Sequence, residues 1–280
     1  MTAVGLRGLS QGFTTNNSRM GFIPRAQRVW AYRRILMLLV RRDLKVRYAG
    51  AFLGYIWSIL DPLLMSLMFW FIFTQIFPRS VGYDPYILYL VSGQMMWFWY
   101  QGAFPGAAHA LQSEAGMVRS TNVPREIWVL RAVIAKGVEY IFSLPVVAIF
   151  AIIYQKPPTW DVLFLPVAIV YCAILLTGWG LILAPLSVLV RDINRFLRVF
   201  VRLTFYLSPI LYSVNNVPQS LHLVFYLNPT VAMFVMARSM FFPEEMRWQP
   251  VVTSACVGIL IFIIGVYVFG RMERRVLKEL

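Results

Sequence analysis

The chain has 280 residues, of which 59% are apolar and only 14% are charged, and its mean hydropathy is +0.66. This composition excludes an ordinary soluble domain and is typical of a protein whose outer surface contacts lipid. The formal net charge of +14 does not indicate nucleic acid as a partner, because the position of the cations along the chain accounts for it.

The N-terminal segment divides into a tail and a helix. Residues 1–24 are rich in Gly, Ser, Thr and Asn, and we expect a disordered cytoplasmic tail there. Residues 25–50 place apolar side chains on one helical face and Arg34, Arg41 and Lys45 on the other. This pattern predicts an amphipathic helix at the membrane interface. Anchoring to lipid headgroups and docking of a cytoplasmic protein both fit it.

Six hydrophobic runs then approach the length of about 20 residues that crosses a bilayer. They cover residues 52–77, 87–108, 127–154, 162–190, 203–214 and 251–270. The fifth run is short, and the third and fourth are long enough to tilt. We therefore predict an all-α integral membrane fold in which residues 51–280 form a domain of six transmembrane helices.

The cations orient this domain. Of the 26 Lys and Arg residues of the whole chain, 22 lie before the first run or between residues 119 and 136, 191 and 202, or 271 and 278. Six spans put all four segments on one side, and Lys and Arg resist translocation. We therefore expect a multi-pass protein of the plasma (inner) membrane with both termini in the cytoplasm.

Two short cytoplasmic segments connect the spans. Residues 110–124 are amphipathic and end at Pro124, which predicts a short helix that contacts a cytoplasmic partner. A solvated connector is the alternative. Residues 191–202 carry four arginines at three- or four-residue spacing, which is typical of a loop that contacts lipid headgroups.

Two acids fall inside the predicted spans, Asp61 before Pro62 and Glu139 three residues after Lys136. A charge at the centre of a membrane helix costs roughly 2.5–3.5 kcal/mol on insertion scales, so each carboxylate should face a partner or water. A capped, kinked helix for Asp61 and an ion pair of Glu139 with Lys136 or Arg131 are the structural alternatives. A carboxylate pair for glycosyl transfer also stays open.

Aromatic residues cluster in the first two spans. The clusters are Phe69, Trp70, Phe71 and Phe73, and Trp97, Phe98, Trp99 and Tyr100. The second cluster lies near mid-bilayer rather than at an interface. Aromatic rings can stack on the apolar faces of sugars, so this cluster suits a conduit for a glycan, with ordinary helix packing as the alternative.

Residues 215–242 contain two semi-apolar stretches that are too short to cross the membrane and are separated by prolines. They predict a re-entrant helical hairpin between spans 5 and 6. Broken backbone at membrane depth is tolerated where it is buried in protein or lines a polar cavity. We place the hairpin at the outer mouth of a pathway, with a loop on the outer surface as the alternative.

Several chemical functions have no support in the sequence. No Gly-x-x-x-x-Gly-Lys-Ser/Thr loop is present, so this chain does not hydrolyse ATP alone. His109 and His222 are far apart, and Cys172 and Cys256 lie in apolar runs, so we predict neither a metal site nor a catalytic residue.

The order of several short motifs resembles a known family. The motifs are Arg42-Asp43-Leu44-Lys45-Val46-Arg47-Tyr48, Leu53-Gly54-Tyr55-Ile56-Trp57-Ser58, Asp61-Pro62-Leu63, Val123-Pro124-Arg125-Glu126, Ser208-Pro209-Ile210-Leu211-Tyr212, Val217-Pro218, Tyr226-Leu227-Asn228-Pro229 and Arg238. Together they resemble the membrane subunits of ABC-2 type polysaccharide exporters, which include exporters of O-antigen, teichoic acid and capsule. The resemblance covers nearly everything from about residue 26 onward.

The resemblance implies a homodimer of six-helix subunits with two copies of a separate ABC ATPase docked beneath it. ATP and Mg would be bound by that partner, and this chain would hold no cofactor. It would be a transport subunit and not an enzyme, and would move a polyprenyl-diphosphate-linked polysaccharide across the membrane.

The resemblance also assigns roles to residues. It predicts contact with the ATPase for Arg41, Arg42, Asp43, Lys45, Arg47, Glu114, Arg119, Arg125 and Glu126. The substrate pathway is predicted to include Asp61, Phe69, Trp70, Phe73, Trp97, Phe98, Trp99, Tyr100, Tyr212 and Asn228. One departure is Ala49-Gly50-Ala51, where relatives often carry a basic or polar residue.

The 22 arginines far outnumber the 4 lysines, consistent with a high-GC genome. The chain is similar to the branch that exports cell-wall galactan in high-GC Gram-positive bacteria, which makes galactan the expected glycan. A drug exporter of the same fold is the alternative within transport. A membrane glycosyltransferase that uses Asp61 and Glu139 is the alternative from another class.

Overall fold

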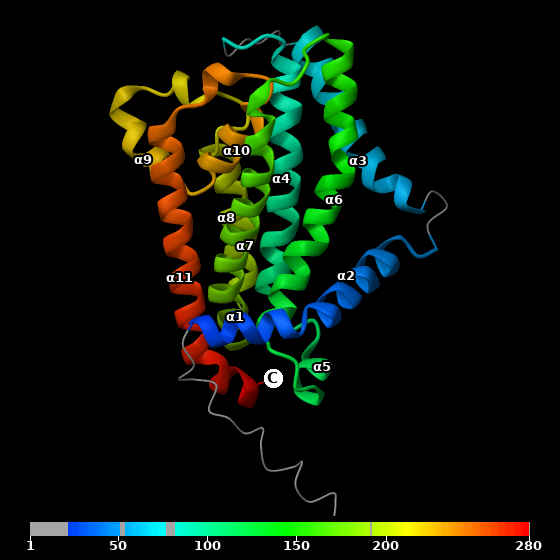
Figure 1. Cartoon of the computed structure of the whole chain (residues 1–280), viewed down its shortest axis with the longest axis vertical. Coiled ribbons are helices and arrows are strands. Elements are labelled where there is room, and N and C mark those ends of the chain that lie inside the picture. Colours follow the sequence, from blue (N-terminus) through cyan, green and yellow to red (C-terminus); the bar gives the residue numbers. More distant parts are fainter. Residues whose placement is uncertain (1–21, 51–53, 77–81, 191, 280) are drawn as a thin grey trace, which may run out of the picture.

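A computed structural model describes residues 22–50, 54–76, 82–190 and 192–279, and no strand occurs in these ranges. The all-α prediction is therefore confirmed. Of the predicted tail, residues 1–21 lie outside the described residues. Figure 1 shows a bundle of upright helices with α1 lying across one end, beside α5 and the last turns of α11. We call this end of the bundle the basic end and the opposite one the far end.

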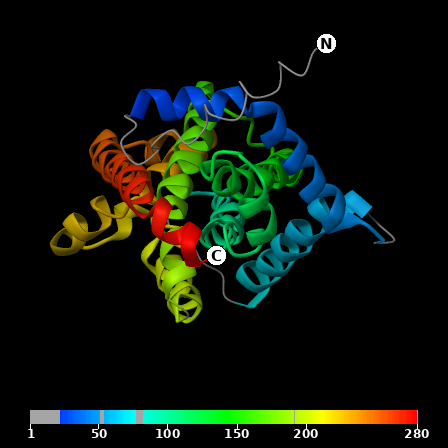
Figure 2. The same ribbon diagram turned by 90° about the horizontal axis from the view of Figure 1, so that it is seen from below.

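The N-terminal amphipathic segment forms two helices, α1 (Phe22–Ala31) and α2 (Arg33–Tyr48). From below, they follow one edge of the bundle (Figure 2). Leu36 and Val40 of α2 form a small apolar cluster with Ile127 and Ala135 of α6 (Glu126–Ile153). Because this face is buried, Arg33, Arg34 and Arg41 of α2 are left on its exposed side.

The centre of the bundle consists of α4 (Tyr86–Ala108), α6, α7 (Phe164–Leu189) and α11 (Trp248–Glu279). α4 is buried along 18 of its 23 residues. Its neighbours are protein helices rather than lipid, and Gln94 is buried among them, whereas Gln101 is exposed. At about 35 Å, α4 has the length of a membrane span.

Glycine allows α7 and α11 to approach closely. A Cβ built on Gly178 of α7 would lie 2.7 Å from the Cα atom of Phe262, and one on Gly265 of α11 would lie 2.5 Å from the Gly178 carbonyl oxygen. These are backbone contacts that no side-chain movement can relieve. Small residues at a helix crossing are a common means of tight packing in membranes.

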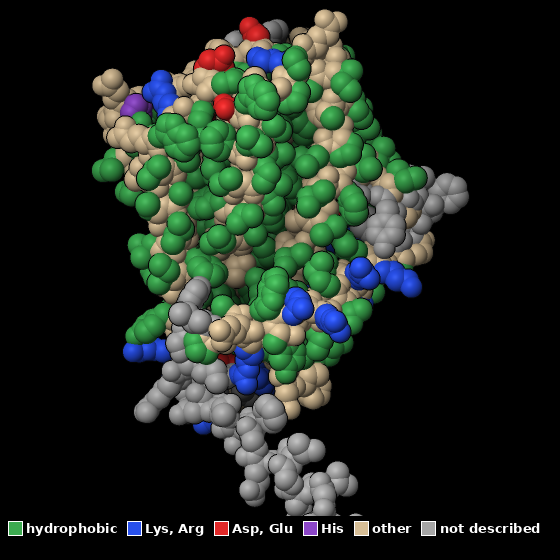
Figure 3. All heavy atoms as spheres, viewed as in Figure 1, with side chains coloured by type: hydrophobic (Ala, Val, Ile, Leu, Met, Phe, Trp, Pro, Cys, Tyr) green, Lys and Arg blue, Asp and Glu red, His purple; other side chains and the backbone are tan. Residues whose placement is uncertain are grey.

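α3 (Trp57–Phe71) is the outer helix of the bundle. It follows the short 3-10 helix η2 (Gly54–Ile56) and continues as one π-helical stretch, η3 (Ile72–Ile76). Half of its described side chains are exposed on the single chain, and only Pro62 and Ser66 are buried. Figure 3 shows hydrophobic side chains over the middle of the molecule and charged ones towards its two ends, as expected for a surface in contact with a membrane.

The region of the fifth predicted span differs from the prediction. The helix there is α8 (Ile193–Leu207), so residues predicted as an inner loop are helical and the helix ends before residue 214. Leu197, Phe200 and Thr204 face the bundle, whereas the three arginines of the helix are exposed. An amphipathic helix, rather than a loop followed by a short span, explains both the spacing of the arginines and the apolar positions between them. Pro209 prevents the helix from continuing.

Short helices fill the predicted hairpin region at the far end. They are η5 (Val214–Asn216), η6 (Gln219–Leu221), α9 (His222–Tyr226), α10 (Val231–Arg238) and η7 (Pro243–Glu245). The segments Gln219–Tyr226 and Val231–Arg238 are bent by 99° relative to each other. α10 is wholly buried, whereas α9 lies at the periphery (Figure 1).

Four helical stretches of the described chain are long and apolar enough to cross a membrane, or five if the bent pair counts as one span. The four are Ile59–Ile76, Glu126–Ile153, Trp160–Leu189 and Trp248–Glu273. The count of six spans stays a prediction. It depends on α4, whose hydropathy is lowered by its polar residues, and on α8, which at about 23 Å is short for a span.

Candidate functional site

An ion network at the basic end joins three segments that are far apart in sequence. Arg42 of α2 contacts Glu114, which precedes α5 (Ala115–Ser120), at 2.5 Å. Arg131 of α6 contacts the same carboxylate at 2.7 Å and Asp43 of α2 at 2.9 Å. The network ties α2 and the α5 segment to α6, and it brings together three of the predicted coupling residues.

The pKa of the Glu114 carboxyl reflects this network. Burial by itself raises that pKa, but hydrogen bonds and charge from Arg131 and Arg42 outweigh burial and lower it below its usual range. Glu114 is therefore ionised at neutral pH, and the network is complete there.

A second ion cluster lies near the start of α1. Arg25 lies 3.7 Å from both Glu126 and Glu273, and Arg125 lies 3.9 Å from Glu273. Arg125 and Glu126, which were predicted to face the ATPase, are thus partly buried and directed at α1 and α11. Arg41, Lys45 and Arg119 are exposed and have no hydrogen bond or ion pair with any described residue. These last three are the predicted coupling residues with free cationic groups.

Arg47, the remaining predicted coupling residue, lies elsewhere. Near the end of α2, its guanidinium donates a hydrogen bond to Glu139 of α6. The other oxygen of the Glu139 carboxylate lies 2.7 Å from Nζ of Lys136. The predicted ion pair of Glu139 with Lys136 is confirmed, whereas Arg131 belongs to the network at the basic end.

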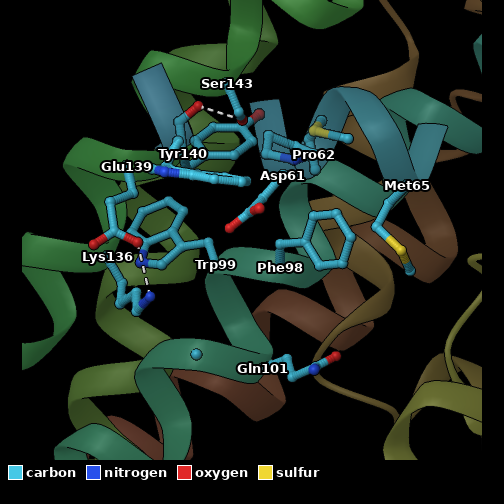
Figure 4. Close-up of a pocket in the computed structure, with 13 residues that line it drawn as sticks. Asp61, Pro62, Met65, Phe98, Trp99, Gln101, Lys136, Glu139, Tyr140 and Ser143 are labelled. Atoms are coloured by element: carbon cyan, nitrogen blue, oxygen red, sulfur yellow. Dashed lines mark hydrogen bonds and ion pairs between the residues drawn. The ribbon is translucent and has the colours of Figure 1, made fainter. Parts of the chain in front are cut away.

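Lys136 and Glu139 line a cavity of about 340 Å³ between α3, α4 and α6. Its walls are formed by Trp57, Asp61, Pro62 and Met65 from α3, Met95, Phe98, Trp99, Gln101 and Gly102 from α4, and Lys136, Glu139, Tyr140 and Ser143 from α6. Figure 4 shows the Asp61 carboxylate directed between Phe98 and Trp99, with Glu139 and Lys136 on the opposite wall. The cavity is a polar, aromatic-lined site within an otherwise apolar bundle.

Asp61 and Glu139 thus line the same cavity, as the glycosyltransferase alternative requires. Glu139, however, is held by two cations, whereas a general acid or base must exchange protons freely. The pair is better suited to binding than to catalysis.

The predicted aromatic residues divide into two groups. Phe98 is half-buried at the cavity wall, and Trp99 contributes an edge while its Nε1 donates to the Val133 carbonyl at 3.0 Å. Trp97 and Tyr100 are only 2% and 1% exposed and stack on each other within the core. Helix packing describes Trp97 better, whereas Tyr100 also lines a second cavity, of about 360 Å³, together with Asn228.

The aromatic residues of α3 and η3 attach this outer helix to the bundle. Nε1 of Trp70 donates to the Tyr154 hydroxyl at 2.9 Å. Phe69 stacks on Phe73, which meets the edge of Tyr86 in α4. All three predicted pathway residues are therefore half-buried between helices at the far end rather than at the cavity.

Tyr212 and Asn228 lie in the hairpin region. The Tyr212 hydroxyl donates to the Tyr206 carbonyl at 2.9 Å. Oδ1 of Asn228 accepts hydrogen bonds from the backbone N–H and the hydroxyl of Thr230, at 3.0 and 2.8 Å. Nδ2 of Asn228 donates to the Leu207 carbonyl at 2.9 Å. Asn228 thus fixes the turn that begins α10.

Sequence reasoning assigned no site role to Arg238, which is fully buried at the far end. Its guanidinium donates to the Tyr89 carbonyl at 3.0 Å and the Ile210 carbonyl at 2.6 Å, and lies 3.8 Å from Glu245. Arg238 thereby joins the hairpin, the end of α8 and α4. One signal was present in the sequence, since Arg238 is a cation in an apolar run outside the basic segments. Arg131 and Lys136 were also missed as site residues.

Comparison with known proteins identifies the family. The sequence matches the family described as "ABC-2 type transporter" over residues 34–242. The chain belongs to the ABC-2 type transporters. The matched range runs from α2 to the loop after α10, so it contains both the network at the basic end and the cavity. The resemblance seen in the motifs is confirmed, and the ABC-2 chain is a membrane transport protein rather than an enzyme.

Its relatives include named export proteins. The O-antigen export system permease protein RfbA of Klebsiella pneumoniae is 26% identical over 242 residues, covering 86% of this ABC-2 chain and 93% of that protein. The protein of the same name from Myxococcus xanthus is 25% identical and covers 83% and 90%. The polysialic acid transport protein KpsM of Escherichia coli is 20% identical and covers 73% and 80%.

Proposed function

We propose that this chain is the membrane subunit of an ATP-driven exporter that moves a polyprenyl-diphosphate-linked polysaccharide out of the cytoplasm, with galactan as the glycan. The observation that carries the proposal is the cavity between α3, α4 and α6, where carboxylates, a lysine and aromatic rings lie inside an apolar bundle. Apolar drugs need no such groups, whereas polyhydroxylated sugars do. The relatives that carry O-antigen and polysialic acid in their names support the same substrate class.

The proposed energy source is a separate ABC ATPase. The chain has no phosphate-binding loop of its own, so two ATPase subunits, which bind ATP and Mg, would dock at the basic end of a homodimer. The exposed cations Arg41, Lys45 and Arg119 suit contact with an acidic surface there. The network around Glu114 would transmit the movement of the ATPase to α2 and α6.

The proposed orientation puts the basic end in the cytoplasm. α1 and the last turns of α11 lie at this same end (Figure 1), so both termini would be cytoplasmic. The segments richest in Lys and Arg would then all remain on the side where such residues are retained.

Depletion of the protein tests this proposal. Export predicts that long lipid-linked polymer accumulates and that it stays inaccessible to enzymes added outside the cell. An intact copy of the gene should reverse the effect, whereas a copy with Arg131→Met, which breaks the network at the basic end, should not. Loss of the polymer itself would indicate synthesis, and an unchanged pool would favour a small-molecule exporter.

A further inference from the structure

An apolar crevice separates α1 from the bundle. Its volume is about 220 Å³, and it lies between α1, α6, α7 and α11. The charged groups in its wall are engaged, since Arg25 lies 3.7 Å from both Glu126 and Glu273. The Thr177 hydroxyl donates to the Ala173 carbonyl at 2.7 Å. The rest of the wall is apolar and consists of Ala26, Val29, Trp30, Leu130, Leu181, Phe262, Val266 and Phe269. Such a space suits a hydrocarbon chain rather than a sugar.

A basic hollow adjoins this crevice. Its volume is about 730 Å³, and Val29 and Trp30 line both spaces. Arg33 and Arg34 line the hollow, are exposed, and form no ion pair with any described residue. The guanidinium of Arg33 lies over the Trp30 ring, with Cζ 5.2 Å from the ring centroid. Two cations without an acidic partner in the described chain thus lie beside the mouth of an apolar crevice.

The position of the two spaces favours a membrane lipid as the occupant. α1 lies across the basic end of the bundle (Figure 1), and Lys and Arg side chains lie beside hydrophobic ones there (Figure 3). Trp30, Met37 and Leu38 are 69%, 49% and 63% exposed. Exposed apolar side chains next to arginines are typical of a helix at the boundary between acyl chains and headgroups. Within the described chain, the crevice shares no lining residue with the cavity between α3, α4 and α6, so its occupant lies off the proposed glycan pathway.

We propose that each subunit binds one anionic phospholipid of the cytoplasmic leaflet here, with an acyl chain in the crevice and the phosphate at Arg33 and Arg34. Guanidinium groups match the geometry of a phosphate, and the cytoplasmic leaflet is the one with a negative surface potential. The choice of leaflet rests on the orientation given under the proposed function. Because α1 is followed after one residue by α2, a lipid that fills the space behind α1 would also hold α2 at the network of the basic end.

A lipid titration tests the site. The full chain, purified with its ATPase in detergent, is titrated with phosphatidylglycerol or with phosphatidylcholine of identical acyl chains, and native mass spectrometry gives the Kd of the first bound lipid. Each arginine near an anionic lipid contributes about fivefold in binding, so phosphatidylglycerol should bind about 25-fold more tightly. Arg33→Gln combined with Arg34→Gln should reduce this preference to about threefold or less. Arg198→Gln combined with Arg202→Gln, which removes two exposed arginines from α8, should preserve it.

A second pair of variants tests whether a chain enters the crevice. Ala26→Trp places a large ring in the crevice from an exposed position of α1. It should weaken both lipids about tenfold, which corresponds to the burial of about two methylene groups, and leave the preference for phosphatidylglycerol unchanged. Ala31→Trp, at an exposed position of α1 outside the crevice wall, should change neither Kd. Circular dichroism confirms that each variant is folded, and the arginine variants, at exposed positions, test the proposal even if Ala26→Trp does not fold.

Three results would overturn the proposal. They are equal binding of the two lipids, a preference that survives the loss of Arg33 and Arg34, and an affinity that a folded Ala26→Trp variant leaves unchanged. Polyprenyl phosphate that binds more tightly than phosphatidylglycerol and displaces it would also overturn the proposal, because the site would then belong to the lipid carrier. Each of these results leaves export intact, whereas an unchanged glycan pool after depletion would refute export and leave lipid binding intact.

Discussion

Replacing Arg238 with alanine should strongly destabilise the far end of the protein. Its guanidinium is fully buried, lies 3.8 Å from the carboxylate of Glu245, and lies over the Tyr89 ring at 3.8 Å. Removing one partner of a buried ion pair typically costs about 3–5 kcal/mol. That is a large part of the total stability of about 5–15 kcal/mol that is usual for folded proteins.

The effect of Arg238→Ala should depend on pH. Burial raises the pKa of the Glu245 carboxyl, and the charge of Arg238 opposes that rise. Without Arg238 this pKa rises further, so the carboxyl is neutral at low pH and forms an uncompensated buried charge only as pH rises through that pKa. The loss of stability should therefore be larger at about pH 8 than at about pH 5.

Denaturation in mixed micelles, followed by circular dichroism, measures this free energy. Arg247→Ala is the matched control, because Arg247 is exposed nine residues further along the chain, and its effect should stay within about 0.5 kcal/mol. Adding Glu245→Gln to Arg238→Ala should recover part of the loss. A variant as stable as the wild type, or one without the pH dependence, would refute the argument.

Two further predictions concern the packing of the bundle and the network at the basic end. Gly178→Ala should cost about 1–3 kcal/mol in the same denaturation assay, because the added Cβ would lie 2.7 Å from the backbone of Phe262. Gly106→Ala, whose Cβ would have no contact closer than 3.8 Å, should leave stability unchanged. Equal effects of the two substitutions would contradict this packing. Glu114→Gln should lose about 1.5–3 kcal/mol at neutral pH. Because the folded-state pKa of Glu114 is lowered, its contribution is complete above the ordinary carboxyl pKa and disappears as pH falls through the lowered value. The variant and the wild type should therefore converge in acid, and a difference that persists there would argue against an ionic role.

Hydrophobic runs predicted the long helices well. The predicted run 162–190 corresponds to α7 (Phe164–Leu189), and the run 127–154 corresponds to α6 (Glu126–Ile153). The helix α8 was misplaced because its arginines were interpreted as a loop. Its apolar positions 197, 200 and 204 have helical spacing, and this signal was available in the sequence.

The site was less predictable than the helices. Arg42 and Glu114 were both singled out for coupling, but their contact across 72 residues of sequence depends on how α2 packs on α6. Trp97 and Trp99 are separated by one residue in a uniform aromatic run, yet only Trp99 lines the cavity. Helix rotation relative to neighbouring helices decides such differences, and a single sequence does not contain it.

The two parts of the site are connected by one helix. α2 carries Arg42 and Asp43 in the network at the basic end and Arg47 at Glu139 in the cavity wall. The two contact points on α6, residues 131 and 139, are separated by about 12 Å of helix rise. An α-helix of this length moves as a unit, so a shift of α2 against α6 at the basic end must also displace Arg47. Glu139 would then keep only Lys136, and the charge balance of the cavity would change without any ligand entering the cavity.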